Sequence, residues 1–151
     1  PGAGWRVVDN RNVGGSLLLG FRHVEEPVDI RVREIGLSRS ERELPFNVLV
    51  TMVVRNYGRS RGFFTRVDKI RRIDVGDHEA LAVFGIRGQG SIERRFAQIF
   101  LRAGRRMVVL SYITKKSLYD RHVVAYEQAL RSFSVTLPEN SPEIALPTPR
   151  P

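Results

Sequence analysis

Four β-rich segments follow one another from residue 63 onward in this 151-residue chain, and a short glycine-containing turn separates each from the next. The segments span residues 63–74, 80–87, 92–101 and 106–114, and the turns between them fall at 76–77, 88–90 and 103–104. Connections this short join antiparallel neighbours, because parallel neighbours need a crossover of a dozen or more residues. The pattern therefore predicts an antiparallel sheet built largely from consecutive hairpins.

Further extended segments are expected before this series, at residues 5–8, 16–24 and 28–35. In the last of them apolar residues alternate with charged ones, which is the period of a strand. Turns are expected at Gly14-Gly15 and at 25–27, where proline follows two glutamates. The unbroken apolar run 107–110 predicts a central strand that is covered on both faces.

Two helices complete the predicted fold. Residues 44–58 carry both strand-forming valines and a helical spacing, and we interpret them as a helix because Pro45 suits a first turn and Gly58 a C-terminal end. The second helix is marked by one apolar stripe, with Ser117 expected as its N-cap: Tyr119, Val123, Tyr126, Leu130 and Phe133. The sum is an α+β fold, an antiparallel β-sheet flanked by helices.

The C-terminal end differs in composition from the rest, since five of the eight prolines lie between residues 138 and 151. Proline lacks a backbone donor and favours extended neighbours, so this segment is expected to be irregular. We therefore expect a single domain over residues 1–137, followed by a Pro-rich tail over 138–151. Such a tail is either a passive linker or a strap along a partner.

The chain is strongly basic, with 25 Lys+Arg against 16 Asp+Glu and a formal net charge of +9. Only three of the cations are lysines, which leaves 22 arginines. A basic surface would form if neighbouring strands carry Arg71, Arg94 and Arg106 on one face. The expected partner-binding residues are Arg71, Arg72, Arg94, Arg95, Arg102, Arg105, Arg106, Phe96 and Phe100.

Such a surface suits nucleic-acid phosphates, anionic lipid headgroups or an acidic protein, and the alternative is a solvated face without a partner. No recognised nucleic-acid-binding motif is present, and the arginines fall at hairpin ends and on strand faces. The planar guanidinium group also suits carboxylate pairing at a protein interface. We therefore favour a docking surface for protein over a nucleic-acid site.

Catalytic motifs are weak in this sequence. The absence of cysteine excludes disulfides, thiolate metal sites and a cysteine nucleophile. Residues 58–62 match G-x-S-x-G, but a nucleophile elbow needs a strand before the serine and a helix after it, and the opposite order is expected here. A hydrolase centred on Ser60 therefore stays a minor alternative, and the glycines of 85–90 are interpreted as a hairpin rather than a phosphate loop.

Metal ligands are likewise not assigned. The one dense group of candidate ligands, Asp74, Asp77, His78 and Glu79, surrounds a turn in which Asp is expected for local hydrogen bonding, so whether it binds a metal stays open. The remaining histidines, His23 and His122, are isolated in sequence and are expected at the surface. We therefore predict no cofactor, no metal and no catalytic residue.

Several short patterns nevertheless resemble one known family. They are an entry Pro1-x-x-x-Trp5, a hairpin at 74–80, paired strands at 96–100 and 107–112, and a closing Leu130-Arg131-Ser132-Phe133. Together they resemble the PsbP-like family, whose fold is shared with the Ran-binding Mog proteins and with bacterial periplasmic lipoprotein domains. The resemblance covers residues 63–137 well and the N-terminal third poorly, and it implies an α-β-α sandwich.

The resemblance also implies a function. Members of the family are mostly non-enzymatic accessory or assembly subunits, exported to a lumen or periplasm, often as lipoproteins, where they bind a membrane complex. We accordingly expect a non-catalytic accessory subunit whose partners are protein subunits of a membrane-associated complex, with an anionic lipid surface as a second partner. The expected location is extracytoplasmic, with a lipid anchor on a removed N-terminal segment. The alternative is a binder of anionic polymers, either nucleic acid or lipopolysaccharide.

Overall fold

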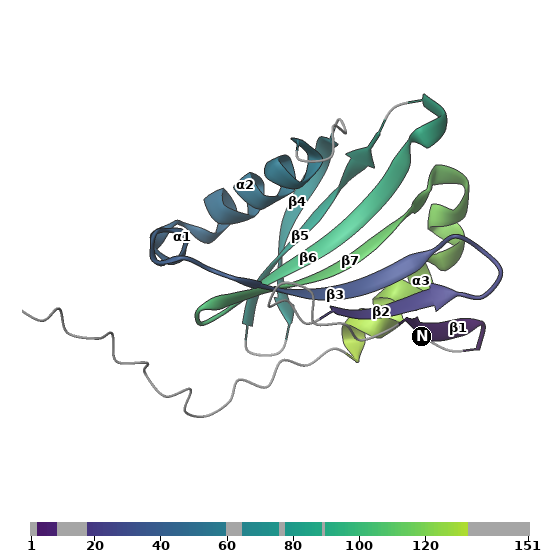
Figure 1. Cartoon of the computed structure of the whole chain (residues 1–151), viewed down its shortest axis with the longest axis horizontal. Coiled ribbons are helices and arrows are strands. Elements are labelled where there is room, and N and C mark those ends of the chain that lie inside the picture. Colours follow the sequence, from purple (N-terminus) through teal and green to yellow (C-terminus); the bar gives the residue numbers. More distant parts are fainter. Residues whose placement is uncertain (1–2, 9–17, 60–64, 76–77, 89, 133–151) are drawn as a thin grey trace, which may run out of the picture.

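The computed structural model describes residues 3–8, 18–59, 65–75, 78–88 and 90–132, which form one seven-stranded antiparallel sheet with helices on both faces (Figure 1). This is the predicted α+β fold. The elements are β1 (Trp5–Val8), β2 (Leu18–His23), β3 (Asp29–Gly36), α1 (Arg39–Glu43), α2 (Phe46–Arg59), β4 (Thr65–Val75), β5 (His78–Arg87), η1 (Gly90–Ile92), β6 (Arg94–Ala103), β7 (Arg106–Lys115) and α3 (Lys116–Arg131).

The strand order is β1-β2-β3-β7-β6-β5-β4. The hairpins β4–β5, β5–β6 and β6–β7 are those that the glycine turns predict. β7 lies at the centre of the sheet, between β6 and β3, which confirms the central strand expected from its apolar run. The pairing of β3 with β7 joins the N-terminal strands to the later meander.

The predicted helix at 44–58 is confirmed as α2, but the acidic residues before it belong to a separate short helix. Ser38 caps α1, since its side chain accepts from the backbone N–H of Glu41 and the Glu41 carboxylate accepts from the backbone N–H of Ser38 at 2.8 Å. This is a capping box. The Ser38 hydroxyl also donates to the Glu41 carboxylate at 2.7 Å, and this bond, together with the one from the backbone N–H of Ser38, lowers the pKa of Glu41.

The predicted N-cap of the last helix is wrong. Ser117 lies inside α3, and the N-cap position is taken by Lys115, which makes no side-chain capping hydrogen bond. The reason is that β7 ends at Lys115 and runs directly into the helix, so no loop residue stands between the two elements.

Each face of the sheet packs against one long helix. Strand alternation sends odd-numbered residues of β7, such as Val109, toward α2 and even-numbered ones, such as Tyr112, toward α3. The α2 layer also contains Phe96 and Phe100, which are 1% exposed. On the other face Tyr112 is fully buried and donates to the backbone oxygen of Tyr119 at 2.8 Å, and burial raises its pKa.

The two faces are covered unequally. α2 packs over β4 and β5, at one side of the sheet, and in the view of Figure 1 β3 and most of β7 extend away from it. The part of the sheet surface that α2 leaves uncovered forms the floor of a pocket. None of the helices in the described part of the chain has both the length and the apolar character of a membrane span.

The edge strand β4 is long and mostly exposed. Its register with β5 shifts between Val67 and Lys69, which marks a β-bulge.

The expected domain end at residue 137 and the Pro-rich tail over 138–151 lie outside the described residues, as do Ser60 and Asp77.

Candidate functional site

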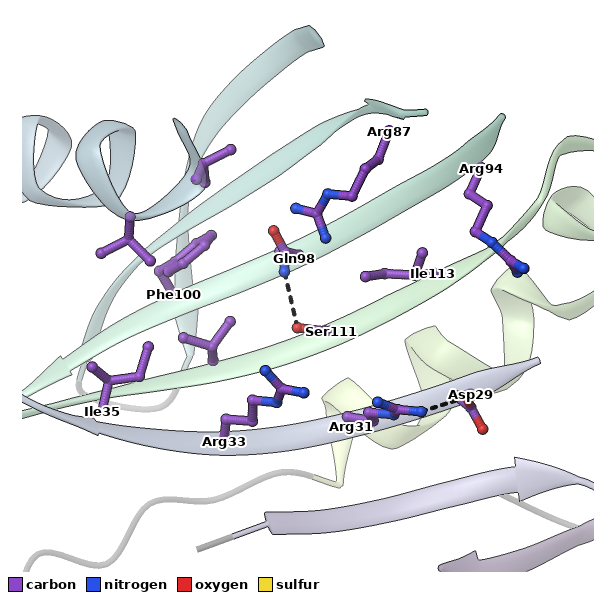
Figure 2. A pocket seen from close by; sticks show the side chains of 13 residues that line it. Asp29, Arg31, Arg33, Ile35, Arg87, Arg94, Gln98, Phe100, Ser111 and Ile113 are labelled. Carbon is purple, nitrogen blue, oxygen red and sulfur yellow. Dashed lines mark hydrogen bonds and ion pairs between the residues drawn. The ribbon is translucent and has the colours of Figure 1, made fainter. Parts of the chain in front are cut away.

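A pocket of about 370 Å³ lies on the α2 face of the sheet, beside the helix (Figure 2). Its floor comes from β3, β5, β6 and β7, and Val53 and Val54 of α2 form one wall. Its polar lining consists of four arginines, one carboxylate, one amide and one hydroxyl: Arg31, Arg33, Arg87, Arg94, Asp29, Gln98 and Ser111. The pocket is therefore positively charged, with apolar walls.

Strand alternation explains why β3 contributes so many charges to the pocket. Its residues Asp29, Arg31 and Arg33 point to the pocket side, as Figure 2 shows, while Ile30 and Val32 pack into the opposite core. Successive side chains of a strand point to opposite faces, so the charged half of the alternation is gathered on one surface.

Asp29 is the only carboxylate among the described residues of the lining, and two arginines hold it. Its Oδ1 accepts from Nε of Arg22 and its Oδ2 from an Nη of Arg31, both at 2.8 Å. Burial acts to raise the pKa of Asp29, but the hydrogen bonds and charges of Arg22 and Arg31 outweigh burial and lower it. Asp29 is thus ionised at neutral pH and offsets part of the positive charge.

The deepest polar residues come from the central strands. Arg87 is only 7% exposed, and its guanidinium group lies over the ring of Phe96, 5.1 Å from the centroid. Beside it, Gln98 donates to the hydroxyl of Ser111 at 3.1 Å. A guanidinium group presents up to five N–H donors in a plane and matches a carboxylate or phosphate with two parallel hydrogen bonds.

The composition of the lining favours the binding of an anion. The hydroxyl of Ser111 accepts a hydrogen bond from the amide of Gln98, and the described lining holds no histidine, lysine or cysteine. A nucleophile needs an adjacent base or a lowered pKa. The arrangement can therefore hold an anionic group on its arginines and an adjoining apolar group on Ile35, Phe100 and Ile113.

The expected partner-binding residues do not form one surface. Arg94 lines the pocket on the α2 side, whereas the register places Arg71 and Arg106 on the α3 side. Arg71, Arg94 and Arg106 therefore do not share one face of the sheet. Phe96 and Phe100 are core residues, which corrects the expectation that they are interleaved with exposed arginines.

The other predicted arginines are scattered and mostly engaged. Arg72 pairs with Glu79 at 2.9 Å, and Arg106 pairs with Glu34. Arg95 lies over the ring of Tyr119 on the α3 side. Arg102 donates to the backbone oxygen of Leu44 at 2.7 Å and lies over Phe46, while Arg105 is exposed at the β6–β7 turn.

Arg31, Arg33, Arg87 and Asp29 were missed from sequence, although one signal was available. The alternation at 28–35 puts two arginines on the same side of a strand, two residues apart. Adjacent arginines such as Arg71 and Arg72, by contrast, point to opposite faces of a strand.

A second polar group lies on the α3 side. His23, Glu26 and His122 each offer one ligand atom, and these atoms lie within 4.8 Å of one another. His122 is only 8% exposed, which corrects the expectation that it is a surface residue. Of the predicted turn cluster, Asp74 is exposed and Glu79 pairs with Arg72, and its described residues form no group of ligands for a metal ion.

Comparison with known proteins identifies the fold. No protein-family model and no curated protein matches the sequence. The structure is similar to cyanobacterial PsbP (CyanoP) from Synechocystis, with a TM-score of 0.66 and 12% identity over 89% of this chain and 83% of that chain. It is also similar to PA94 of Pseudomonas aeruginosa, a protein of unknown function suggested to be a regulator, with a TM-score of 0.62 and 14% identity over 74% of each chain. The chain therefore has a PsbP-like fold.

Proposed function

We propose that this chain is a non-catalytic accessory protein that docks onto a partner by binding an acidic segment of that partner in the arginine-lined pocket. The observation that carries the proposal is the convergence of Arg31, Arg33, Arg87 and Arg94 on one hollow of the sheet surface. Arginines from three different strands meet there: Arg31 and Arg33 come from β3, Arg87 from β5 and Arg94 from β6.

The shape of the pocket favours a protein segment over a nucleic acid. A nucleic acid binds along a track of cations that follows its backbone, whereas these arginines surround one confined hollow. Apolar side chains lie directly beside the arginines, so the occupant best suited to the site combines a carboxylate with an apolar neighbour. An Asp or Glu next to Leu or Phe in a peptide has this composition.

The location of the partner is part of the proposal. PsbP-like proteins, which the sequence resembles, mostly bind membrane complexes on the lumenal or periplasmic side. We therefore place the acidic segment on a subunit of a membrane-associated complex in an extracytoplasmic compartment. Fractionation of the source cells tests this step separately: recovery of the chain only in the cytosol would refute the location and leave the pocket chemistry intact.

Two double variants with the same change in net charge test the pocket. Arg33→Gln/Arg94→Gln removes two pocket cations, and Arg71→Gln/Arg72→Gln removes two cations from the edge strand β4. The probe is a short fluorescein-labelled peptide in which Asp and Leu alternate, and its fluorescence anisotropy reports binding. We expect the pocket variant to bind at least about tenfold more weakly, a loss of about 1.4 kcal/mol, and the β4 variant to bind nearly as the parent does.

Two results would contradict the proposal. Equal losses in both variants would show that net charge, rather than the pocket, attracts the peptide. Tighter binding of a labelled single-stranded DNA than of the peptide, with an affinity that falls steeply as salt rises, would favour the anionic-polymer alternative. A matching peptide of Asn and Leu controls for apolar contacts, because it keeps the shape and lacks the charge.

A further inference from the structure

On the side of the sheet opposite the pocket, two side chains from around the β2–β3 turn meet one from α3, which is almost one hundred residues away in sequence. His23 ends β2, Glu26 lies in the turn before β3, and His122 lies on α3. We infer that His23, Glu26 and His122 form a binding site for a divalent transition-metal ion of the zinc class. This inference is independent of the proposed docking function, because the two sites share no residue.

The ligand set selects the class of metal. Two imidazoles and one carboxylate are typical ligands of Zn²⁺, whereas Ca²⁺ and Mg²⁺ prefer sites made of oxygen atoms alone. The three ligand atoms lie within 4.8 Å of one another. Zinc bonds of about 2.0–2.1 Å bring tetrahedral ligands closer together than this limit, so small side-chain rotations are enough to close the site. A water molecule would complete the coordination.

The hydrogen bonds of His23 indicate which of its two ring nitrogens carries the proton of the neutral ring. Its Nε2 lies against Gly4, where an added Cβ would approach that atom within 3.2 Å. Its Nδ1 accepts from the backbone N–H groups of Glu25 and Glu26 at 3.4 and 3.3 Å. The proton of the neutral ring then lies on Nε2, and Nδ1 keeps the lone pair that a metal needs. Both hydrogen bonds are long, so a metal displaces them at little cost.

His122 and Glu26 are already held together. Nε2 of His122 contacts Oε2 of Glu26, and that hydrogen bond is the main reason that the pKa of the Glu26 carboxyl is lowered. The ring of Trp5 stands at right angles to both imidazoles, with centroids 5.3 Å from His23 and 5.8 Å from His122. The aromatic contacts fix the two rings before a metal arrives, so little ordering is left for the metal to impose.

One neighbour opposes the metal. Arg121 pairs with Oε1 of Glu26 and places a positive charge beside the site. Removal of this charge should therefore strengthen metal binding, whereas it would weaken a purely structural cluster in which Arg121 and Glu26 hold α3 to the β2–β3 turn. The effect of Arg121 thus distinguishes a metal site from a structural cluster.

Trp5 provides the measurement, because it is the only tryptophan in the chain and contacts both histidines. Co²⁺ is titrated into the metal-free protein at neutral pH, and the quenching of Trp5 fluorescence and the ligand-field absorption of tetrahedral Co²⁺ are followed. We expect one saturable site that Zn²⁺ empties by competition. His23→Gln and Glu26→Gln should weaken binding at least about tenfold, and Arg121→Gln should tighten it.

His78 is the matched control, because it is the only other histidine of the chain and lies on β5. His78→Gln should leave both signals unchanged. The inference is overturned by the absence of a saturable signal in the parent protein, or by equal weakening in His78→Gln and His23→Gln. Circular dichroism of each variant verifies its fold, and the partly exposed His23 carries the test if His122→Gln does not fold.

Discussion

Neutralising Asp29 should strengthen the binding of an acidic peptide, which is the opposite of what most substitutions in a binding pocket do. The carboxylate lies among the pocket arginines and repels an incoming anion. With an effective dielectric constant of about 40 and a separation of about 8 Å, Coulomb's law gives roughly 1 kcal/mol of repulsion. Asp29→Asn removes it, so the peptide should bind roughly fivefold more tightly in the anisotropy assay.

The same substitution should lower stability in a pH-dependent way. Asp29 makes ion pairs with Arg22 and Arg31, and its side chain is 26% exposed, so the two pairs together contribute about 1 kcal/mol. The pKa of Asp29 is lowered in the folded protein. Its contribution is therefore complete above the pKa of an unfolded Asp, about 3.9, and is lost as pH falls through the lower folded value. Urea unfolding should show a deficit of about 1 kcal/mol for Asp29→Asn at pH 7 that shrinks below about pH 4.

Weaker peptide binding by Asp29→Asn, in a protein whose circular dichroism matches the parent, would refute the reasoning. That result would mean that Asp29 positions Arg31 for the ligand and that this positioning outweighs its repulsion. Asp68→Asn is the matched control, because Asp68 also pairs with an arginine at 2.8 Å but lies on the exposed strand β4, away from the pocket. It should leave the affinity for the peptide unchanged.

Two substitutions across the β5–β6 ladder test the core. Phe96→Ala should reduce the free energy of unfolding by about 3–5 kcal/mol, because the side chain is 1% exposed. Urea unfolding measures this change, and an unchanged stability would contradict the burial of Phe96. Gly85→Ala should lower the stability of the fold by about 2 kcal/mol or more, because an added Cβ would lie 2.2 Å from the backbone oxygen of Arg66. Gly36→Ala is the control, since nothing lies within 4 Å of its added Cβ, and it should change thermal stability little. Equal effects of the two substitutions would contradict the close packing at Gly85.

Local signals accounted for most of the fold. Short turns set the pairing of β4, β5, β6 and β7, and the apolar stripe of 119–133 located α3. Helix α1 was missed because five residues are too few to show a period, although Ser38 and Glu41 carry the spacing of a capping box. These features depend on neighbours in sequence, so they can be predicted from it.

The sites depend on contacts between distant segments and were therefore largely missed. Arg33 and Arg87 line one pocket only because β3 pairs with β7 and so joins the later meander, a pairing that no short turn enforces. His122 is buried because the β2–β3 turn covers the flank of α3 that its stripe leaves free, where Glu26 meets it. A helical wheel shows the stripe but not what covers the other side.

The exposed arginines of the bulged edge strand β4 can have an effect without binding a partner. Its outer side pairs with no described strand, and such an edge is a template on which further copies of a chain can add strands. Along it the exposed cations Arg66, Lys69, Arg71 and Arg72 outnumber the exposed acids Asp68 and Asp74, so two approaching edges carry a net like charge and repel each other. Positive charge along this strand should thus keep copies of the chain from pairing edge to edge, whether or not the pocket binds a partner.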